Sequence, residues 1–257
     1  MQLNHKTIFI TGASSGIGRA LAEELSRYPV NLLLGMRDVK KFEALPGKAA
    51  LSAKPVHFDL ASQASIDKCF AAAKADFQKV DILINNAGQF VAGPVQDLDM
   101  NAVYPMFQVN LVGLTHVTAK FLQVMLARGS GKIVNNASIA GYAYFPKNST
   151  YSATKAGVVA FSESLRRELE GSNVSVLHLV TPGVQTRMTG QIEATYAKTG
   201  KQPNLKSIPP AVWAKKVARA IEADKTILSP GGAVGLSKIL AHGPPMLMDI
   251  ISRKIFN

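Results

Sequence analysis

Short apolar runs alternate with longer segments of helical period along most of the 257-residue chain. Strands that are apolar on both faces and alternate with helices form a parallel sheet covered by helices on both sides. The sequence therefore predicts one doubly wound α/β domain over residues 1–257. The runs rich in Leu, Ile and Val predict strands near 6–11, 30–35, 55–58, 80–85, 131–137, 173–180 and 225–229. The segments between them predict helices over 17–27, 62–77, 100–128, 150–169 and 209–223, with Ser62 and Ser149 or Thr150 as N-caps and Pro209-Pro210 opening the last.

The composition of the chain argues against nucleic acid and structural metal ions as binding partners. The formal net charge is +12, but the basic residues are scattered in runs of no more than two, with no basic stripe interleaved with aromatic residues. We therefore expect no specific nucleic-acid site. The one cysteine, Cys69, cannot form an internal disulfide, and the five histidines show no metal-ligand spacing. This pattern favours a reducing compartment such as the cytoplasm, without a structural metal.

Two apolar segments are candidates for targeting or membrane insertion. The N-terminal stretch 1–18 runs directly into glycines and polar residues and lacks the features of a secretory signal. The uncharged stretch 100–119 is about long enough to span a bilayer, but it contains Asn101, Pro105 and Gln108. We expect a buried helix there, and no transmembrane span.

A glycine-rich turn, TGASSGIG at 11–18, directly follows the first predicted strand and opens the first predicted helix. In this context glycines allow backbone N–H groups to approach a pyrophosphate at the positive end of a helix. The alternative is that the glycines serve only a tight strand-to-helix turn.

The residue after the second strand indicates which nicotinamide cofactor fits. An acid there would accept hydrogen bonds from the ribose hydroxyls, whereas a cation would pair with a 2′-phosphate. The strand ends at Met36 and Arg37 follows, with Lys40 and Lys41 as auxiliaries. The sequence therefore favours NADP(H). The alternative is that Arg37 is a solvated cation paired with Asp38.

Tyr151 and Lys155 are four residues apart, one turn of a predicted helix, so both project from one face. A buried cation beside a phenol is expected to lower the phenol pKa and make the ring useful for proton exchange. A tyrosine and a lysine at this spacing are common in proteins, so the pair alone does not indicate catalysis. The catalytic interpretation is supported here by Ser138, at the end of the fifth predicted strand, and by Asn110, in the long predicted helix before that strand.

These motifs together resemble the short-chain dehydrogenase/reductase family: TGASSGIG at 11–18, NNAG at 85–88, Asn110, Ser138, the Tyr151/Lys155 pair and PGVQT at 182–186. The resemblance covers residues from about 5 to 230. It implies a Rossmann-type fold of seven parallel strands, a nicotinamide cofactor and no metal.

The resemblance also implies a role for each matching residue. Tyr151 would be the general acid toward a carbonyl oxygen, which Ser138 would hydrogen-bond and orient. Lys155 would lower the phenol pKa and hold the nicotinamide ribose, and Asn110 would bind a water that links Lys155 to solvent. The cofactor-binding set would comprise Gly12, Ser14, Ser15, Ile17 and Gly18 at the phosphates, Arg37 at the 2′-phosphate, Asp59 and Leu60 at the adenine, Asn86, Ala87 and Gly88 at the ribose, and Val184 and Thr186 at the carboxamide, together with Tyr151 and Lys155.

Two segments bear on the substrate. A mobile substrate loop is expected at 187–207, and the candidate pocket residues are apolar or aromatic: Ile139, Tyr142, Tyr144, Phe145 and Met188. The alternative is that several of these pack against the helix of Tyr151 without meeting a ligand. The C-terminal extension 230–257 carries an apolar stripe that would cover the cleft, pack on a partner subunit or touch a membrane surface: Met246, Leu247, Ile250, Ile251 and Phe256.

The leading hypothesis is an NADP(H)-dependent oxidoreductase that reduces a hydrophobic or medium-sized ketone or aldehyde, or oxidises the corresponding alcohol. The alternatives are a 3-oxoacyl-carrier-protein reductase, for which a basic surface suits an acidic carrier, and a regulator that senses NADP(H) without turnover. The family resemblance implies a homodimer or homotetramer.

Overall fold

The computed structural model describes residues 1–197 and 207–230. At its centre lies one seven-stranded sheet with the order β3-β2-β1-β4-β5-β6-β7, in which every neighbouring pair is parallel. The predicted seven-stranded, doubly wound fold is therefore confirmed. The strands are β1 (Thr7–Thr11), β2 (Asn31–Met36), β3 (Ser52–His57), β4 (Ile82–Asn85), β5 (Gly131–Asn136), β6 (Val174–Leu179) and β7 (Ile227–Leu228).

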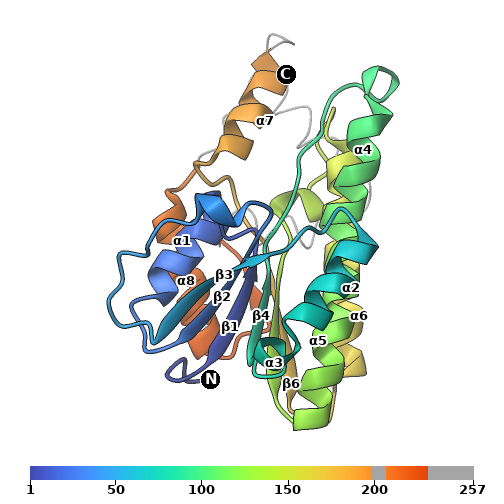
Figure 1. Ribbon diagram of the computed structural model, residues 1–257. Helices are drawn as coiled ribbons and strands as arrows, with labels where there is room; N and C mark the ends of the chain where they lie inside the picture. The colour runs from blue at the N-terminus through green and yellow to red at the C-terminus, as the bar shows by residue number, and fades with distance from the viewer. Residues whose placement is uncertain (198–206, 231–257) are drawn as a thin grey trace.

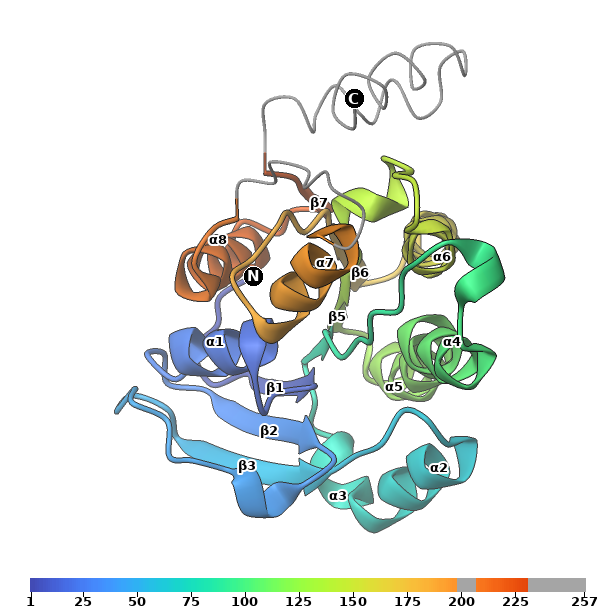
Figure 2. The same cartoon turned by 90° about the horizontal axis from the view of Figure 1, so that it is seen from above.

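Helices cover both faces of the sheet (Figure 1, Figure 2). On one face, α1 (Gly16–Leu25) and α8 (Pro210–Glu222) pack together over a core that includes Ile10, Leu32 and Trp213. On the other face, a second core contains the aromatic cluster of Phe9, Phe77 and Phe121. The helices on this second face are α2 (Gln63–Ala72), α3 (Lys74–Phe77), α4 (Met100–Phe107), α5 (Leu114–Arg128) and α6 (Ser149–Glu168).

The helix ends confirm some predictions and correct others. Ser62 caps α2, because its hydroxyl accepts a hydrogen bond from Ser65 N at 3.3 Å. The prediction that Ser149 or Thr150 caps α6 is wrong: the cap position is Asn148, whose side chain makes no capping hydrogen bond. Pro209 and Pro210 open α8 as predicted.

The long helix predicted over 100–128 is confirmed as one helical stretch, and it contains a π-helical segment that the sequence did not predict. Pro105 lies inside α4, and the next six residues form the π-helical segment η3 (Gln108–Gly113) before α5 begins. In length and hydropathy, Met100–Arg128 would suffice to cross a bilayer. Its inner side chains, however, are buried in the second core, with Val117, Phe121 and Met125 fully inaccessible. The stretch therefore packs as a core helix.

The segment expected to be a substrate loop is helical in its first half. Residues Arg187–Ala197 form α7, which stands above the carboxyl ends of the strands in Figure 1. The prediction of a loop is therefore wrong for these residues. The rest of that segment, 198–206, and nearly all of the C-terminal extension, 231–257, lie outside the described residues.

The strand order reverses direction between β1 and β4. From β1 the chain builds outward through β2 to β3, and it then returns to build β4 through β7 on the other side. In open α/β sheets, ligands bind in the crevice that such a reversal leaves at the carboxyl ends of the strands.

Candidate active site

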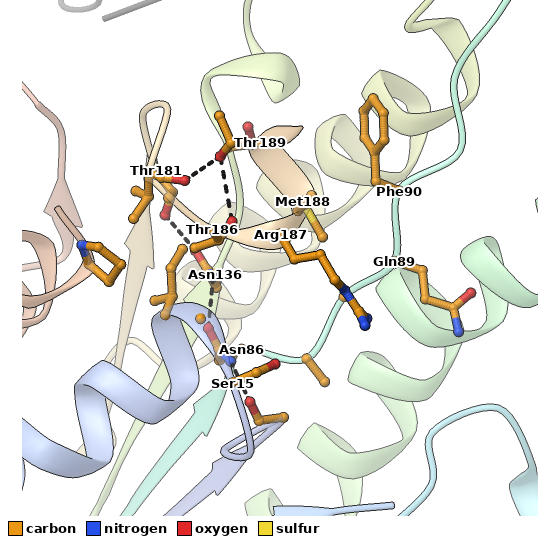
Figure 3. A pocket seen from close by; sticks show the side chains of 18 of the residues that line it. Ser15, Asn86, Gln89, Phe90, Asn136, Thr181, Thr186, Arg187, Met188 and Thr189 are labelled. Carbon is orange, nitrogen blue, oxygen red and sulfur yellow. Dashed lines mark hydrogen bonds between the residues drawn. The ribbon is translucent and has the colours of Figure 1, made fainter. Parts of the chain in front are cut away.

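A large cleft opens at this reversal point, with a volume of about 1020 Å³. It extends from the turn after β1, past the ends of β4 and β5, to the start of α7 (Figure 3). Fourteen of the fifteen residues predicted to bind cofactor line it: Gly12, Ser14, Ser15, Ile17, Arg37, Asp59, Leu60, Asn86, Ala87, Gly88, Tyr151, Lys155, Val184 and Thr186. Of the predicted catalytic residues, Ser138, Tyr151 and Lys155 line the cleft and Asn110 does not.

The glycine turn forms a tight cradle at one end of the cleft. Gly12 has φ +69°, a conformation that L side chains rarely adopt. Gly18, which does not line the cleft, packs beneath the turn, where an added Cβ would stand 2.1 Å from the Gly12 carbonyl oxygen. Asn86 Nδ2 also donates to the Thr11 carbonyl at 3.0 Å. The turn thus keeps its backbone against the cleft at the N-terminus of α1, and this arrangement fits a pyrophosphate.

The loop after β2 places Arg37 in the cleft. Asp38 does not pair with Arg37: its carboxylate accepts from Lys40 N at 3.1 Å and lies 3.7 Å from Lys41 Nζ. Within the described parts of the chain, no carboxylate forms an ion pair with Arg37. Its guanidinium, which is exposed, is therefore available to an anionic ligand.

The lining of the cleft also includes Asp59 and Leu60, which follow the end of β3 after one intervening residue. The Asp59 carboxylate accepts from Ala61 N at 3.0 Å, which closes a local turn, and Leu60 is buried with 5% of its surface exposed. Asp59 therefore has a structural hydrogen bond in addition to its place in the cleft wall.

Tyr151 lies on the first turn of α6 with 7% of its surface exposed. Its ring meets Phe90 edge to face, with 5.0 Å between the centroids. Burial raises the pKa of Tyr151 to about 12, although a hydrogen bond with Ser138 opposes the shift. The expectation of a lowered phenol pKa is therefore wrong for this structure, because burial is the larger effect.

Lys155 lies one turn further along α6. Its ammonium donates to the Asn136 carbonyl at 2.8 Å and stands 5.8 Å from the centroid of the Tyr151 ring. Burial lowers the pKa of Lys155 to about 8. The phenol and the amine thus face one space, as their spacing predicts, and the amine titrates nearer to neutral pH than an ordinary lysine.

Asn110 is fully buried in the π-helical segment, behind Gly88. Its Oδ1 accepts from Gln89 N at 2.7 Å, and its Nδ2 donates to the Gln89 carbonyl at 2.9 Å and to Thr154 Oγ1 at 3.1 Å. The side chain therefore joins the loop after β4 to α6. The water-relay role that the family implies for Asn110 stays a prediction.

A chain of side-chain hydrogen bonds connects the ends of three strands beneath the cleft (Figure 3). Asn136 Nδ2 donates to Asn86 Oδ1 at 3.1 Å, and the Thr181 hydroxyl donates to Asn136 Oδ1. Sequence reasoning missed Asn136, which also accepts from Lys155 through its backbone. Its place two residues before Ser138 on β5 is the signal that could have found it.

Of the five residues predicted to line a substrate pocket, three lie in the wall of the cleft. Ile139, Phe145 and Met188 line the cleft, whereas Tyr142 and Tyr144 do not. Tyr142 is buried, with its hydroxyl 2.8 Å from His178 Nε2, and Tyr144 is 53% exposed. Among the lining residues that the sequence did not single out are Gln89, Phe90 and Arg187.

The sheet, the reversal point and the cradle define a doubly wound α/β protein with a dinucleotide-type cleft. A family model described as short chain dehydrogenase matches residues 6–197. The chain belongs to the short-chain dehydrogenase family, as its motifs predicted.

Two related proteins agree with this assignment. An uncharacterised oxidoreductase from Staphylococcus epidermidis is 33% identical over 188 residues, which is 73% of this chain and 82% of that protein. The ketoacyl reductase HetN from Nostoc sp. is 34% identical over 222 residues, or 82% of this chain and 75% of that protein.

Solved structures share the fold over nearly the whole chain. A short-chain dehydrogenase from Burkholderia cenocepacia in complex with NADP superposes with a TM-score of 0.81 at 23% identity, covering 97% of this chain and 98% of that one. A short-chain dehydrogenase/reductase from Burkholderia phymatum in complex with NAD gives a TM-score of 0.80 at 26% identity, covering 96% of each chain.

Proposed function

We propose that this oxidoreductase reduces a ketone or aldehyde, or oxidises the corresponding alcohol, with NADP(H) as cofactor. The observation that carries the proposal is the meeting of Ser138, Tyr151 and Lys155 in the cleft that begins at the glycine turn. A phenol, a hydroxyl and an ammonium around one space supply both the hydrogen bonds and the proton that a developing alkoxide needs.

Tyr151 acts in this proposal as the general acid. With its pKa raised to about 12, the phenol carries its proton at neutral pH and can donate it to the carbonyl oxygen. Ser138 hydrogen-bonds the same oxygen and orients it, while Lys155, fixed on the Asn136 carbonyl, holds the nicotinamide ribose. The nicotinamide, when bound, supplies the hydride.

The preference for NADP(H) rests on Arg37. This cation lines the cleft directly after β2, and Asp38 is engaged elsewhere, with Lys40 and Lys41. The related structures include complexes with NADP and with NAD, so the preference is a property proposed for this chain from its own residues.

The apolar character of the substrate rests on side chains near Tyr151. Phe90 packs against the phenol ring, and Ile139, Phe145 and Met188 add further apolar surface to the cleft. Apolar walls with a few polar groups at the reacting atom favour a medium-sized hydrophobic carbonyl compound over a sugar.

A second candidate is a 3-oxoacyl-carrier-protein reductase. It is favoured by the 34% identity with the ketoacyl reductase HetN and by the net charge of +12, which suits an acidic carrier. The reacting residues would be the same; only the acyl chain and the carrier would differ.

We further propose that the chain is one domain that works in the cytoplasm as a homodimer or homotetramer. Exposed apolar side chains along the outer face of α4, η3 and α5 support assembly, with Tyr104 72% and Val112 53% exposed. Association would remove this surface from water.

The test begins with calorimetric titration of the protein with NADPH and with NADH. A carbonyl panel containing apolar ketones, aldehydes and an acetoacetyl thioester follows, with oxidation of NADPH as the readout. We expect tighter binding of NADPH and turnover of an apolar ketone. Turnover of the thioester alone would favour the second candidate. Tight NADPH binding with no turnover of any carbonyl would contradict the enzymatic proposal and favour a sensor of NADP(H).

A further inference from the structure

One cation in the cleft has no part in the site described above. Arg187 is the first residue of α7 and lines the cleft. Figure 3 shows its side chain pointing into the pocket, in the space bordered by Ser15 and Asn86 on one side and Gln89 on the other. Throughout the described ranges 1–197 and 207–230, no side chain forms an ion pair or hydrogen bond with it.

The backbone of Arg187 is held beside the glycine turn. The preceding residue, Thr186, packs on that turn: a Cβ built on Gly16 would stand 3.3 Å from the Thr186 methyl carbon. Thr189 Oγ1 donates to the Val184 carbonyl, and Gln185 N donates to the Ile208 carbonyl at 3.0 Å. The start of α7 is therefore fixed beside the N-terminus of α1, while Arg187 itself is exposed.

The other cations near the turn are already engaged or lie elsewhere. Arg19 Nε pairs with Glu23 at 2.7 Å, and its two terminal nitrogens donate to the carbonyls of Glu43 and Ala44 at 2.7 and 3.0 Å. Lys155 donates to the Asn136 carbonyl. Arg37 lies after β2, in the position of a 2′-phosphate contact. Among the described residues, Arg187 is the cation left to face a diphosphate held by the glycine turn.

We propose that Arg187 closes over the pyrophosphate of bound NADP(H) from the side opposite the glycine turn. This inference rests on the proposed function. The turn and the N-terminus of α1 offer N–H groups to one side of the two phosphates, and the guanidinium offers paired donors and a full positive charge to the other. Through this contact, the position of α7 would depend on whether the nucleotide is bound. Because α7 carries Met188 in the cleft wall, the nucleotide would also affect that wall.

The experiment measures nucleotide binding by calorimetry, without turnover. The probes are ADP-ribose 2′-phosphate, which contains the pyrophosphate, and adenosine 2′-monophosphate, which lacks it. The variants are Arg187→Gln, Arg187→Lys and the control Arg27→Gln. Arg27 follows α1 at the edge of the sheet away from the cleft, has a side chain that is 71% exposed, and loses the same charge.

We expect Arg187→Gln to weaken ADP-ribose 2′-phosphate about tenfold to a hundredfold, as for the loss of one charge-assisted contact. Adenosine 2′-monophosphate should bind the variant as it binds the wild type. Arg187→Lys should fall between the two, and Arg27→Gln should match the wild type with both probes.

Two results would overturn the inference. If Arg187→Gln binds ADP-ribose 2′-phosphate as tightly as the wild type does, or if Arg27→Gln weakens it equally, Arg187 makes no pyrophosphate contact. A rise in the KM of an anionic carbonyl substrate with unchanged nucleotide affinity would instead assign Arg187 to the substrate. Failure of the proposed function differs from both, because it would appear in the wild type itself, either as no binding of NADPH or as binding of NADPH with no turnover of any carbonyl compound.

Discussion

Replacement of Gly18 by alanine tests whether the glycine turn is a nucleotide cradle held by close packing. A Cβ at this position would stand 2.1 Å from the Gly12 carbonyl oxygen and 2.5 Å from Asn86 Nδ2, whereas real Cβ atoms essentially never approach closer than 3.0 Å. The nearest atom belongs to the backbone. The turn must therefore move by about 0.9 Å from the helix, and the N–H groups facing the cleft move with it.

Two opposing effects determine how much Gly18→Ala changes the free energy of unfolding. Alanine favours a helix interior over glycine by about 0.5–1 kcal/mol, and forcing a methyl group into a packed region costs about 1–3 kcal/mol. We expect Gly18→Ala to lower the free energy of unfolding by about 1–2 kcal/mol. Since a displacement of about 1 Å at a binding group can cost up to about a hundredfold, NADPH affinity should fall at least about tenfold.

The assay is calorimetric titration with NADPH together with denaturant unfolding, and Gly190→Ala is the matched control. Gly190 is also helical, but a Cβ there meets no atom within 4 Å. The control should bind NADPH as the wild type does and gain about 0.5–1 kcal/mol of stability. Wild-type affinity and stability in Gly18→Ala would refute the packing argument.

Two further predictions concern the charges of the cleft. Arg37→Gln should weaken NADPH about tenfold to a hundredfold and leave NADH unchanged; equal loss for both cofactors in parallel titrations would contradict the 2′-phosphate assignment. Burial lowers the pKa of Lys155 to about 8 from the ordinary lysine value of 10.5. Between those pH values the unfolded chain binds more protons than the folded protein, so the contribution of Lys155 to the free energy of unfolding increases as the pH rises. The free energy of unfolding of the wild type, measured relative to Lys155→Met, should therefore increase by up to about 1.4 kcal/mol per pH unit between about pH 8 and pH 10; a flat or falling difference would show that Lys155 keeps an ordinary pKa.

The fold could be predicted because parallel strands that are buried on both faces appear in the sequence as short, continuous apolar runs. β2 reads NLLLGM and has five buried residues, and each predicted strand has a counterpart in the sheet. Breaks within helices have no such signature. The apolar period continues through Ala73, so the local sequence predicts one helix where the structure has α2 and α3. It also continues through the π-helical segment after Pro105, so the local sequence does not mark this change of hydrogen bonding within the helix Met100–Arg128.

The candidate site could be predicted as far as its motifs reach. Tyr151, Lys155, Ser138 and the glycine turn meet in the cleft because they follow strand ends or share a helix face. For Tyr142 the alternative that it does not meet a ligand holds, because its hydroxyl lies within hydrogen-bond distance of a buried histidine and it does not line the cleft. The sequence could not decide this, since an aromatic residue near a site has the same sequence appearance in either case.

Other features depend on three-dimensional surroundings. The raised pKa of Tyr151 results from the burial that its neighbours impose, and Phe90 contributes to this environment from a loop sixty-one residues earlier in the chain. The α7 helix was expected to be a loop because its sequence is rich in Thr, Gly and Gln, which have weaker helix propensity or mark turns. Arg187 was missed for the same reason.

The central claim is that the Tyr151 phenol delivers the proton to the substrate oxygen. The most direct measurement is the single-turnover rate of NADPH oxidation by Tyr151→Phe at saturating cofactor and ketone, with NADPH affinity measured in parallel. The account predicts a rate about 10² to 10⁴ times lower than that of the wild type, with NADPH affinity nearly unchanged. A variant that oxidises NADPH at the wild-type rate would contradict it.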